Sequence, residues 1–205
     1  MKKFYFIALA FLGFACSEED TAPELSYDRN IMQVELDTGY STQVFIDFDL
    51  DQNNTVSVSK TESNYTTFDF SEETTVEANI LDSWDVVFTQ YHILIPMGEG
   101  EYYPYDVTGA LVNTLGGAKA VAINDTNFET LTLEEAMTLE LTDDMQSIGY
   151  NWKQLDFATY KYAMVENMYY VIKTEKGEFL KLRFIDFYNE NGDKGYPAFE
   201  YQRLQ

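Results

Sequence analysis

The sequence is short of the residues that cross-link a small domain or hold a metal ion. Its 205 residues include one cysteine, Cys16, and one histidine, His92. A single cysteine excludes an internal disulfide and a cysteine-based metal cage, and a single histidine excludes a two-histidine metal motif. The sequence also has no Gly-x-Ser-x-Gly nucleophile motif and no phosphate-binding glycine loop. These absences argue against an enzyme, a hydrolase included, and favour a binding or structural protein.

Basic residues are scarce as well. There are 13 Lys and Arg residues against 35 Asp and Glu residues, which gives a formal net charge of −22. Nucleic-acid binding depends on basic side chains that meet phosphates, so that class of function is excluded. The same charge argues against direct adsorption of the body to anionic lipid. A strongly acidic surface favours solubility and says little about the fold.

The longest apolar stretch lies at the N-terminus and is too short to span a membrane. After Lys2 and Lys3, residues 4–15 form a twelve-residue run of apolar or small side chains, which is typical of an export signal. The run ends in Ala15 followed by Cys16, and a small residue before a cysteine resembles a bacterial lipoprotein processing site. We predict a signal peptide over residues 1–15 and a lipid on Cys16. A secretory peptide with an unmodified cysteine is the alternative.

The residues that follow indicate where the lipid would hold the chain. Residues 17–20 (SEED) resemble the serine-plus-acidic signal that directs lipoproteins of Bacteroidetes to the cell surface. Residues 16–30 are polar and acidic and contain Pro23, so we interpret them as a flexible tether. The prediction is a protein anchored in the outer membrane and facing the cell exterior.

The body of the chain, residues 31–205, favours β-structure. The sequence contains 16 Tyr and 15 Phe, which suit half-buried strands, and Met32, Val34 and Leu36 alternate with polar residues. Turns are indicated at 37–39, 51–54, 175–177 and 189–193. Further strands are predicted over 43–50, 55–60, 65–70, 83–96, 105–111, 120–123, 169–174, 179–188 and 198–204. Many strands with frequent turns predict an all-β domain, mostly antiparallel, as a sandwich or open barrel.

Helical signals are few. Residues 132–135 fit a capping box, and residues 142–145 indicate a second helix start that Gly149 would end. Both helices would be short.

Alternating carboxylates at Asp47, Asp49 and Asp51 imitate a calcium-binding loop. The loop lacks the glycine and the terminal glutamate that such loops use, since Gln52 and Val58 stand at those positions. Because the carboxylates alternate with apolar residues, we interpret them as the solvent-facing side of a strand.

Several strings, in order and at consistent spacing from residue 31 to the end, resemble the HmuY family of haem-binding surface or secreted lipoproteins of Bacteroidetes. The last string, residues 194–201, is the most specific of them. The strings are residues 39–45 (GYSTQVF), 83–91 (SWDVVFTQY), 169–174 (YYVIKT), 181–184 (KLRF) and 194–201 (KGYPAFEY).

This resemblance implies a mostly antiparallel β fold that captures haem between two axial side chains on loops. Characterised relatives use paired histidines or paired methionines, and one histidine rules out the first pair within one chain. Matching Trp152 to a recurring Gly-Trp of relatives places Tyr160 near the second ligand position, with Met164 four residues on. The haem-ligand candidates are therefore Met137, Met145, Tyr160 and Met164, with His92 as a secondary candidate. For each methionine, core packing is the competing interpretation, as packing or hydrogen bonding is for His92.

The leading hypothesis is a haemophore-like protein that binds haem and passes it to an outer-membrane TonB-dependent receptor. Haem propionates are anions, and Lys119, Lys153 and Lys161 are the nearest basic candidates to pair with them. The alternative is a non-haem binding or structural module that recognises a glycan, a protein or another small ligand through exposed aromatic faces.

Overall fold

The computed structural model describes residues 29–36, 42–50, 56–62 and 84–205. The signal peptide, Cys16 and all but the last residues of the tether lie outside the described residues. The turns predicted at 37–39 and 51–54 and the strand predicted at 65–70 lie outside them too, in whole or in large part.

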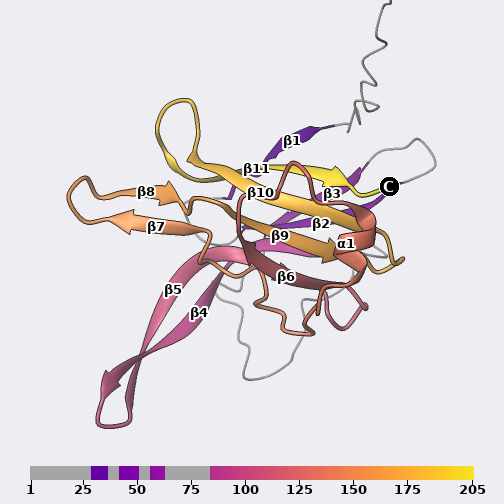
Figure 1. Cartoon of the computed structure of the whole chain (residues 1–205). Helices are drawn as coiled ribbons and strands as arrows, with labels where there is room; N and C mark the ends of the chain where they lie inside the picture. Colours follow the sequence, from indigo (N-terminus) through magenta and orange to yellow (C-terminus); the bar gives the residue numbers. More distant parts are fainter. Residues whose placement is uncertain (1–28, 37–41, 51–55, 63–83) are drawn as a thin grey trace, which may run out of the picture.

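The described ranges contain eleven strands and one helix, and all strand pairings are antiparallel (Figure 1). A five-stranded sheet has the order β1-β11-β10-β9-β6, a four-stranded sheet has the order β3-β2-β4-β5, and β7 and β8 form a separate pair. This confirms the predicted all-β, mostly antiparallel fold. The elements are β1 (Asn30–Gln33), β2 (Thr42–Leu50), β3 (Val56–Glu62), β4 (Val86–Gly98), β5 (Glu101–Val112), β6 (Lys119–Asn124), α1 (Leu133–Met137), β7 (Lys153–Asp156), β8 (Lys161–Met164), β9 (Met168–Lys173), β10 (Phe179–Tyr188) and β11 (Lys194–Arg203).

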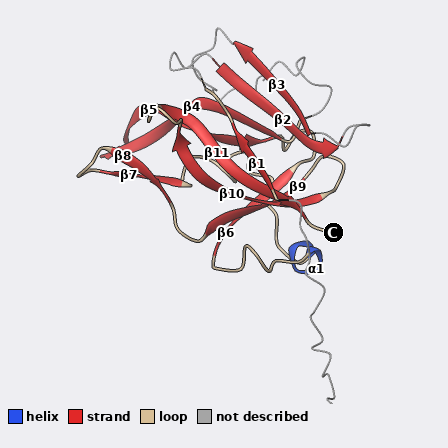
Figure 2. Ribbon diagram, turned by 90° about the horizontal axis from the view of Figure 1, so that it is seen from above, coloured by secondary structure: helices blue, strands red, loops and turns tan. Residues whose placement is uncertain are grey.

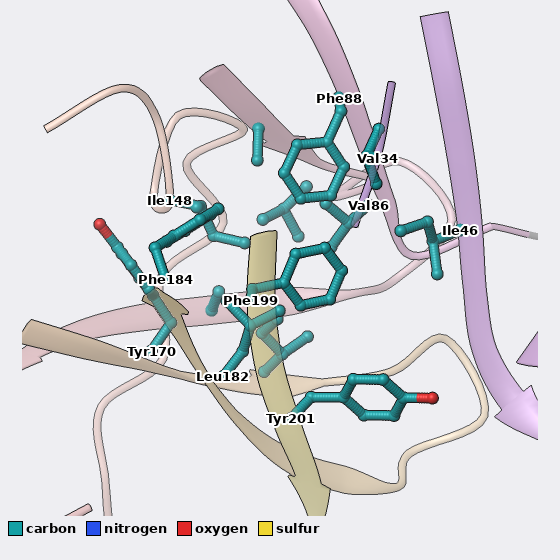
Figure 3. Packing of buried hydrophobic residues seen from close by; sticks show 14 of the residues in the cluster. Val34, Ile46, Val86, Phe88, Ile148, Tyr170, Leu182, Phe184, Phe199 and Tyr201 are labelled. Carbon is teal, nitrogen blue, oxygen red and sulfur yellow. The ribbon is translucent and has the colours of Figure 1, made fainter. Parts of the chain in front are cut away.

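The main core lies between the two larger sheets and is dominated by aromatic rings (Figure 3). Phe88 of β4 stacks on Phe199 of β11, with 5.3 Å between ring centroids and 10° between planes. Trp152 stacks on Phe184 of β10 at 3.9 Å and 10°. Offset and edge-on aromatic pairs add about 0.5–1.5 kcal/mol each beyond their buried area. The stack of Phe88 on Phe199 therefore joins the two sheets directly, and Figure 2 shows how the strands of these sheets are layered.

The predicted alternation places the first strands correctly. Val44 and Ile46 of β2 are fully covered in the main core, as the period-two pattern requires. Val34 and Leu36 lie beyond the end of β1, but their backbone N–H groups still donate to β11, to the carbonyls of Pro197 and Gly195. These two hydrogen bonds therefore continue the pairing with β11 beyond the end of β1.

One of the two predicted helices forms. At α1, Thr132 accepts a hydrogen bond from the Glu135 N–H, and the Glu135 carboxylate accepts one from the Thr132 N–H, which is a complete capping box. The prediction of a second helix from residue 142 is wrong. Thr142 accepts the Asp144 N–H and Asp144 accepts the N–H of Gln146, so the side chains stabilise turns and no helix follows. No helix within the described ranges is long and apolar enough to cross a membrane.

The predicted turns between late strands are present. Thr174 and Glu178 close a hairpin around residues 175–177, and Gly177 at φ 90° takes the left-handed position. Asn189 and Asp193 close the turn between β10 and β11 in the same way.

The interpretation of Asp47 and Asp49 as solvent-facing is wrong. Both are buried, at 7% and 3% exposure, because β2 is covered on both faces by packed side chains. They meet Asp85, whose carboxylate accepts the N–H groups of Phe48 and Glu175, each at 2.8 Å. Burial, with the neighbouring carboxylates adding to it, raises the pKa of Asp85 to about 6. This carboxyl group joins β2, β4 and the β9–β10 turn.

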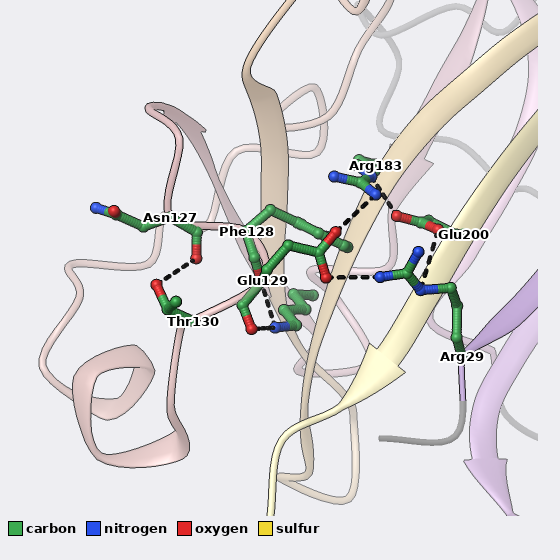
Figure 4. Close-up of polar contacts among 8 residues, drawn as sticks. Arg29, Asn127, Phe128, Glu129, Thr130, Arg183 and Glu200 are labelled. Atoms are coloured by element: carbon green, nitrogen blue, oxygen red, sulfur yellow. Dashed lines mark hydrogen bonds and ion pairs between the residues drawn. The ribbon is translucent and has the colours of Figure 1, made fainter. Parts of the chain in front are cut away.

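An ion-pair network fixes the point where the N-terminal segment meets the body (Figure 4). Arg29 contacts Glu129 at 2.6 Å and Glu200 at 3.6 Å. Arg183 contacts the same two carboxylates, with Glu129 at 2.9 Å. The segment that leads into β1 is therefore held against β10 and β11 by two shared acids.

Candidate functional site

Two hairpins project from the same side of the sheets (Figure 1). The longer consists of β4 and β5, which pair from Val86–Val112 out to the tip. β2 pairs with β4 only along residues 86–88, so within the described ranges no further strand pairs with the outer half of β4 on that side. Leu94, at 65% exposure, and Tyr102, at 62%, are consequently open to solvent.

The shorter hairpin consists of β7 and β8 and was not predicted. Its strands have four residues each and join through residues 157–160. The carboxylate of Asp156 accepts the Ala158 N–H at 2.8 Å and the Thr159 hydroxyl at 2.7 Å, which holds the loop. Such short strands with mixed charge and no turn glycine give little period-two signal.

A cleft of about 1480 Å³ opens between the two hairpins. Just over half of its lining residues are aliphatic or aromatic, and most of the others are polar or charged. Two cations, Lys153 and Lys194, and two carboxylates, Asp106 and Asp144, are among the lining residues. The apolar lining residues are Leu36, Ile93, Leu94, Ile95, Pro96, Pro104, Val107, Leu155, Phe157 and Phe187, and the phenols are Tyr105, Tyr150 and Tyr162.

The loop before β7, at the inner end of the cleft, is joined to β5 by backbone hydrogen bonds. Ala110 and Gly149 exchange two backbone hydrogen bonds of 2.9 Å, and Gly149 has φ 64°. Gly109 lies so close that an added Cβ would be 2.5 Å from the Gly149 carbonyl oxygen. The indole N–H of Trp152 donates to that same carbonyl at 3.1 Å. Glycine at these positions lets the loop before β7 pack directly on the hairpin wall.

Lys153 is the cation at the base of the cleft. Its ammonium lies 4.0 Å from the ring centroid of Trp152, 4.9 Å from that of Phe187 and 5.7 Å from that of Tyr162. It donates a hydrogen bond to the carbonyl of Thr108 on β5. Burial lowers the pKa of Lys153 to about 7. A cation set among rings and partly deprived of water is a ready partner for an anionic group of a ligand.

The four leading haem-ligand candidates are not among the residues that line this cleft. Met137 is the last residue of α1 and is exposed, at a separate hollow of about 630 Å³. Met145 packs against the cluster that contains Tyr91. Met164 lies in β8 against the main core, and Tyr160, at 79% exposure, stands at the tip of the β7–β8 hairpin.

The secondary candidate, His92, lies in β4 opposite Asp106 in the strand register. Asp106 lines the cleft, so the backbone of His92 is beside it; the His92 side chain is outside what the structure describes. Of the three lysines considered for propionates, only Lys153 is among the lining residues. Lys119 instead contacts Asp143 at 2.6 Å.

Sequence reasoning missed the three phenols and pointed to their neighbours. Tyr162 is two residues after Tyr160, and Tyr150 follows Met145 in the same loop. A prediction of a strand over 161–164 would have placed Tyr162 and Met164 on the inward face, since alternate residues share a face. The missing signal was therefore the short hairpin itself.

Chemically, the cleft suits a large, mostly apolar ligand that carries an anionic group. Its side walls offer burial for apolar surface, and Lys153 offers one charge-assisted contact at the base. Its phenols can donate or accept hydrogen bonds, and as phenolates they can ligate a metal centre.

Comparison with known proteins gives one family match. The family described as HmuY protein matches residues 39–201. No curated protein matches the chain.

Several solved structures share a distant likeness with the chain. A candidate lipoprotein from Bacteroides fragilis is 13% identical, with 87% of this chain and 90% of that chain covered and a TM-score of 0.44. A candidate HmuY-like haem-binding protein from Bacteroides vulgatus is 16% identical, with 86% and 92% covered and a TM-score of 0.40. The apo form of a HmuY analogue from Tannerella forsythia is 12% identical, with 86% and 96% covered and a TM-score of 0.43.

Proposed function

Because this chain belongs to the HmuY family, we propose that it is a surface-exposed lipoprotein that binds haem between its β4–β5 and β7–β8 hairpins. The observation that carries the proposal is the cleft of about 1480 Å³, with apolar walls and a lysine at its base. Small-molecule sites are typically concave and mostly apolar, with a few placed polar groups. The proposed role is binding and delivery, without catalysis.

Each part of the cleft has a part of haem that it suits. The aliphatic side chains of β4, among them Ile93 and Leu94, offer a wall for one face of the macrocycle. Leu155 and Phe157 of the shorter hairpin offer the facing wall. Burial of apolar surface stabilises such a complex by about 25 cal/mol per Å² before the cost of association is subtracted.

The charges of the cleft suit one end of the ligand better than the other. Lys153 and Lys194 can pair with the carboxylates of haem, whereas Asp106 and Asp144 would repel them. A carboxylate beside Lys153 would also raise the pKa of that lysine from about 7 toward its ordinary value. Ligand binding and protonation of Lys153 are therefore coupled in the proposal.

The anchoring part of the proposal concerns residues outside the described ranges. A lipid on Cys16 and an acidic tether would hold the body at the outer face of the outer membrane, from which haem passes to a TonB-dependent receptor. The body would begin where Arg29 is held by Glu129 and Glu200. Labelled palmitate should enter the wild-type protein and not Cys16→Ala; equal labelling of both would contradict the anchor.

Haemin titration of the purified protein tests the ligand. We expect a one-to-one complex with a sharpened Soret band. Leu94→Asp places a charge on the apolar wall and should weaken binding about tenfold, which is about 1.4 kcal/mol. Leu115→Asp is the matched control, because Leu115 is 80% exposed and is not among the residues that line the cleft.

The titration also separates haem from other ligands. If no stoichiometric complex forms in either redox state, the haem proposal fails. The alternative is then a module that recognises a glycan, a protein or another small ligand, and exposed Tyr102 and Tyr103 at the hairpin tip favour it. Equal affinity of the two leucine variants would mean that haem binds outside the cleft.

A further inference from the structure

Among the described side chains, those that line the cleft include no methionine, histidine or cysteine. The side chain of His92, on β4, is outside what the structure describes. The inference that follows rests on the proposed haem function. The side-chain donors that face the cleft and are known to ligate haem iron are the phenols of Tyr105, Tyr150 and Tyr162. This chain would then hold the iron through oxygen, whereas characterised relatives use paired histidines or methionines as ligands.

The three phenols differ in how firmly they are placed. Tyr105 lies on the outer part of β5 and is 47% exposed. Tyr150 packs edge-on against Tyr91, with 6.4 Å between centroids, and belongs to the cluster behind the hairpin. Tyr162 lies in β8, is half-buried and faces Leu155 across the short hairpin.

Tyr162 is held by two contacts from β10. Its backbone N–H donates to the hydroxyl of Tyr188 at 2.7 Å. Its ring packs edge-on against Phe187, with 5.3 Å between centroids and 85° between planes. A ligand residue must keep its position within a fraction of an ångström, and a side chain fixed by packing meets that need better than one on an open strand.

Tyr162 also has a cation beside it. The Lys153 ammonium is 5.7 Å from the centroid of its ring. Among the described contacts, no lysine or arginine is placed over the rings of Tyr105 or Tyr150. The ammonium packed against the ring helps to fix the position of Tyr162 in the cleft.

We infer that Tyr162 ligates the iron of bound ferric haem as a phenolate, and that Lys153 is a positioning residue that holds the Tyr162 ring in place. In this step the phenol gives its proton to solvent, and the phenolate oxygen donates an electron pair to iron. No electron is transferred and the iron stays ferric. Since an anionic oxygen ligand stabilises ferric over ferrous iron, the site selects the oxidised form of haem.

Resonance Raman spectra of the ferric complex test the inference. The wild-type protein should show the bands of an iron–phenolate bond, and Tyr162→Phe should lose them and bind ferric haem about tenfold more weakly. Tyr160→Phe is the matched control, because Tyr160 is on the same hairpin and points to solvent. Tyr105→Phe and Tyr150→Phe should keep the bands, and so should His92→Ala.

Lys153→Met tests the positioning role separately. The variant should still show the iron–phenolate bands, but the bands should broaden, since the Tyr162 ring loses the ammonium that packs against it. Bands identical to those of the wild type would remove Lys153 from the site. Circular dichroism of Tyr162→Phe should match the wild type, which excludes misfolding as the cause of the loss.

The outcomes separate this inference from the proposed function. Haem bound to the wild type without phenolate bands, or with bands that survive in Tyr162→Phe, overturns the ligand assignment and leaves the haem proposal standing. A loss of coordination in His92→Ala alone would assign the iron to that histidine. No haem complex at all overturns both.

Discussion

The core between the sheets and the cleft between the hairpins are both built from aromatic and aliphatic side chains, yet only the core is closed. Phe199 in the core is fully buried, whereas Phe157 at the edge of the cleft is 78% exposed. The two regions differ in coverage: among the described residues, no other strand pairs with the outer part of the β4–β5 hairpin, and β7 and β8 pair only with each other. An exposed apolar surface of this kind suits the proposed binding of a ligand.

The largest expected effect separates the two regions by stability. Phe199→Ala removes a ring that contacts Phe48, Phe88 and Phe184, and should lower the free energy of unfolding by about 3–5 kcal/mol. Phe157→Ala should change it by less than about 0.5 kcal/mol, because that ring is exposed. Urea denaturation measures both. Similar losses for the two variants would contradict the contrast between a closed and an open region.

A smaller effect tests the polar part of the closed region. Asp85→Ala leaves the buried N–H of Phe48 and the part-buried N–H of Glu175 without this acceptor and should cost about 2–4 kcal/mol of stability at pH 4. The folded-state pKa of about 6 is above the ordinary value of 3.8, so the stabilisation is complete below pH 3.8 and is lost as the pH rises through 6. The difference in unfolding free energy between wild type and variant should therefore become smaller from pH 4 to pH 7.

The matched control for Asp85 is a carboxylate of the open region. Asp106 is exposed on β5, and Asp106→Ala should alter stability by less than about 0.5 kcal/mol at either pH. If the stability difference between wild type and Asp85→Ala instead grows between pH 4 and pH 7, the pKa of Asp85 is not raised.

The smallest expected effect concerns the base of the cleft. The pKa of Lys153 in the folded protein, about 7, is below the ordinary value of 10.5. The contribution of Lys153 to stability is therefore complete above pH 10.5, where the amine is neutral, and is lost as the pH falls through 7. Lys153→Met keeps the apolar stem and should be more stable than wild type by about 1 kcal/mol at pH 6 without ligand. The difference should shrink toward pH 10, as thermal unfolding of the two proteins would show; a constant difference would speak against a buried ammonium.

Much of the fold could be predicted from local sequence. The alternation of Val44 and Ile46, the capping box at Thr132 and the turn at Gly177 are each specified within a few neighbouring residues. The burial of Asp47 could not be predicted in this way, because it depends on what covers the second face of β2. The same pattern of residues would face solvent in a sheet with one open face.

Three of the four predicted haem ligands, Met145, Tyr160 and Met164, lie in segments that form the cleft, but none of the four is among the residues that line it. Tyr160 and Met145 belong to the hairpin and the loop that form the cleft, yet one points to solvent and the other packs inward. Neighbours of each, Tyr162 and Tyr150, line the cleft instead. Tyr160 lies in the turn before β8 and Met145 lies in a loop, so the direction of neither side chain predicts that of Tyr162 or Tyr150. Residues that line a cleft can therefore be missed from the sequence unless the short hairpin itself is recognised.

Anomalous diffraction at the iron absorption edge from crystals of the haem complex would locate the bound haem. We expect one iron peak between the β4–β5 and β7–β8 hairpins, with Lys153 near one edge of the macrocycle. An iron peak at the hollow beside Met137, or on the outer surface of either sheet, would contradict it.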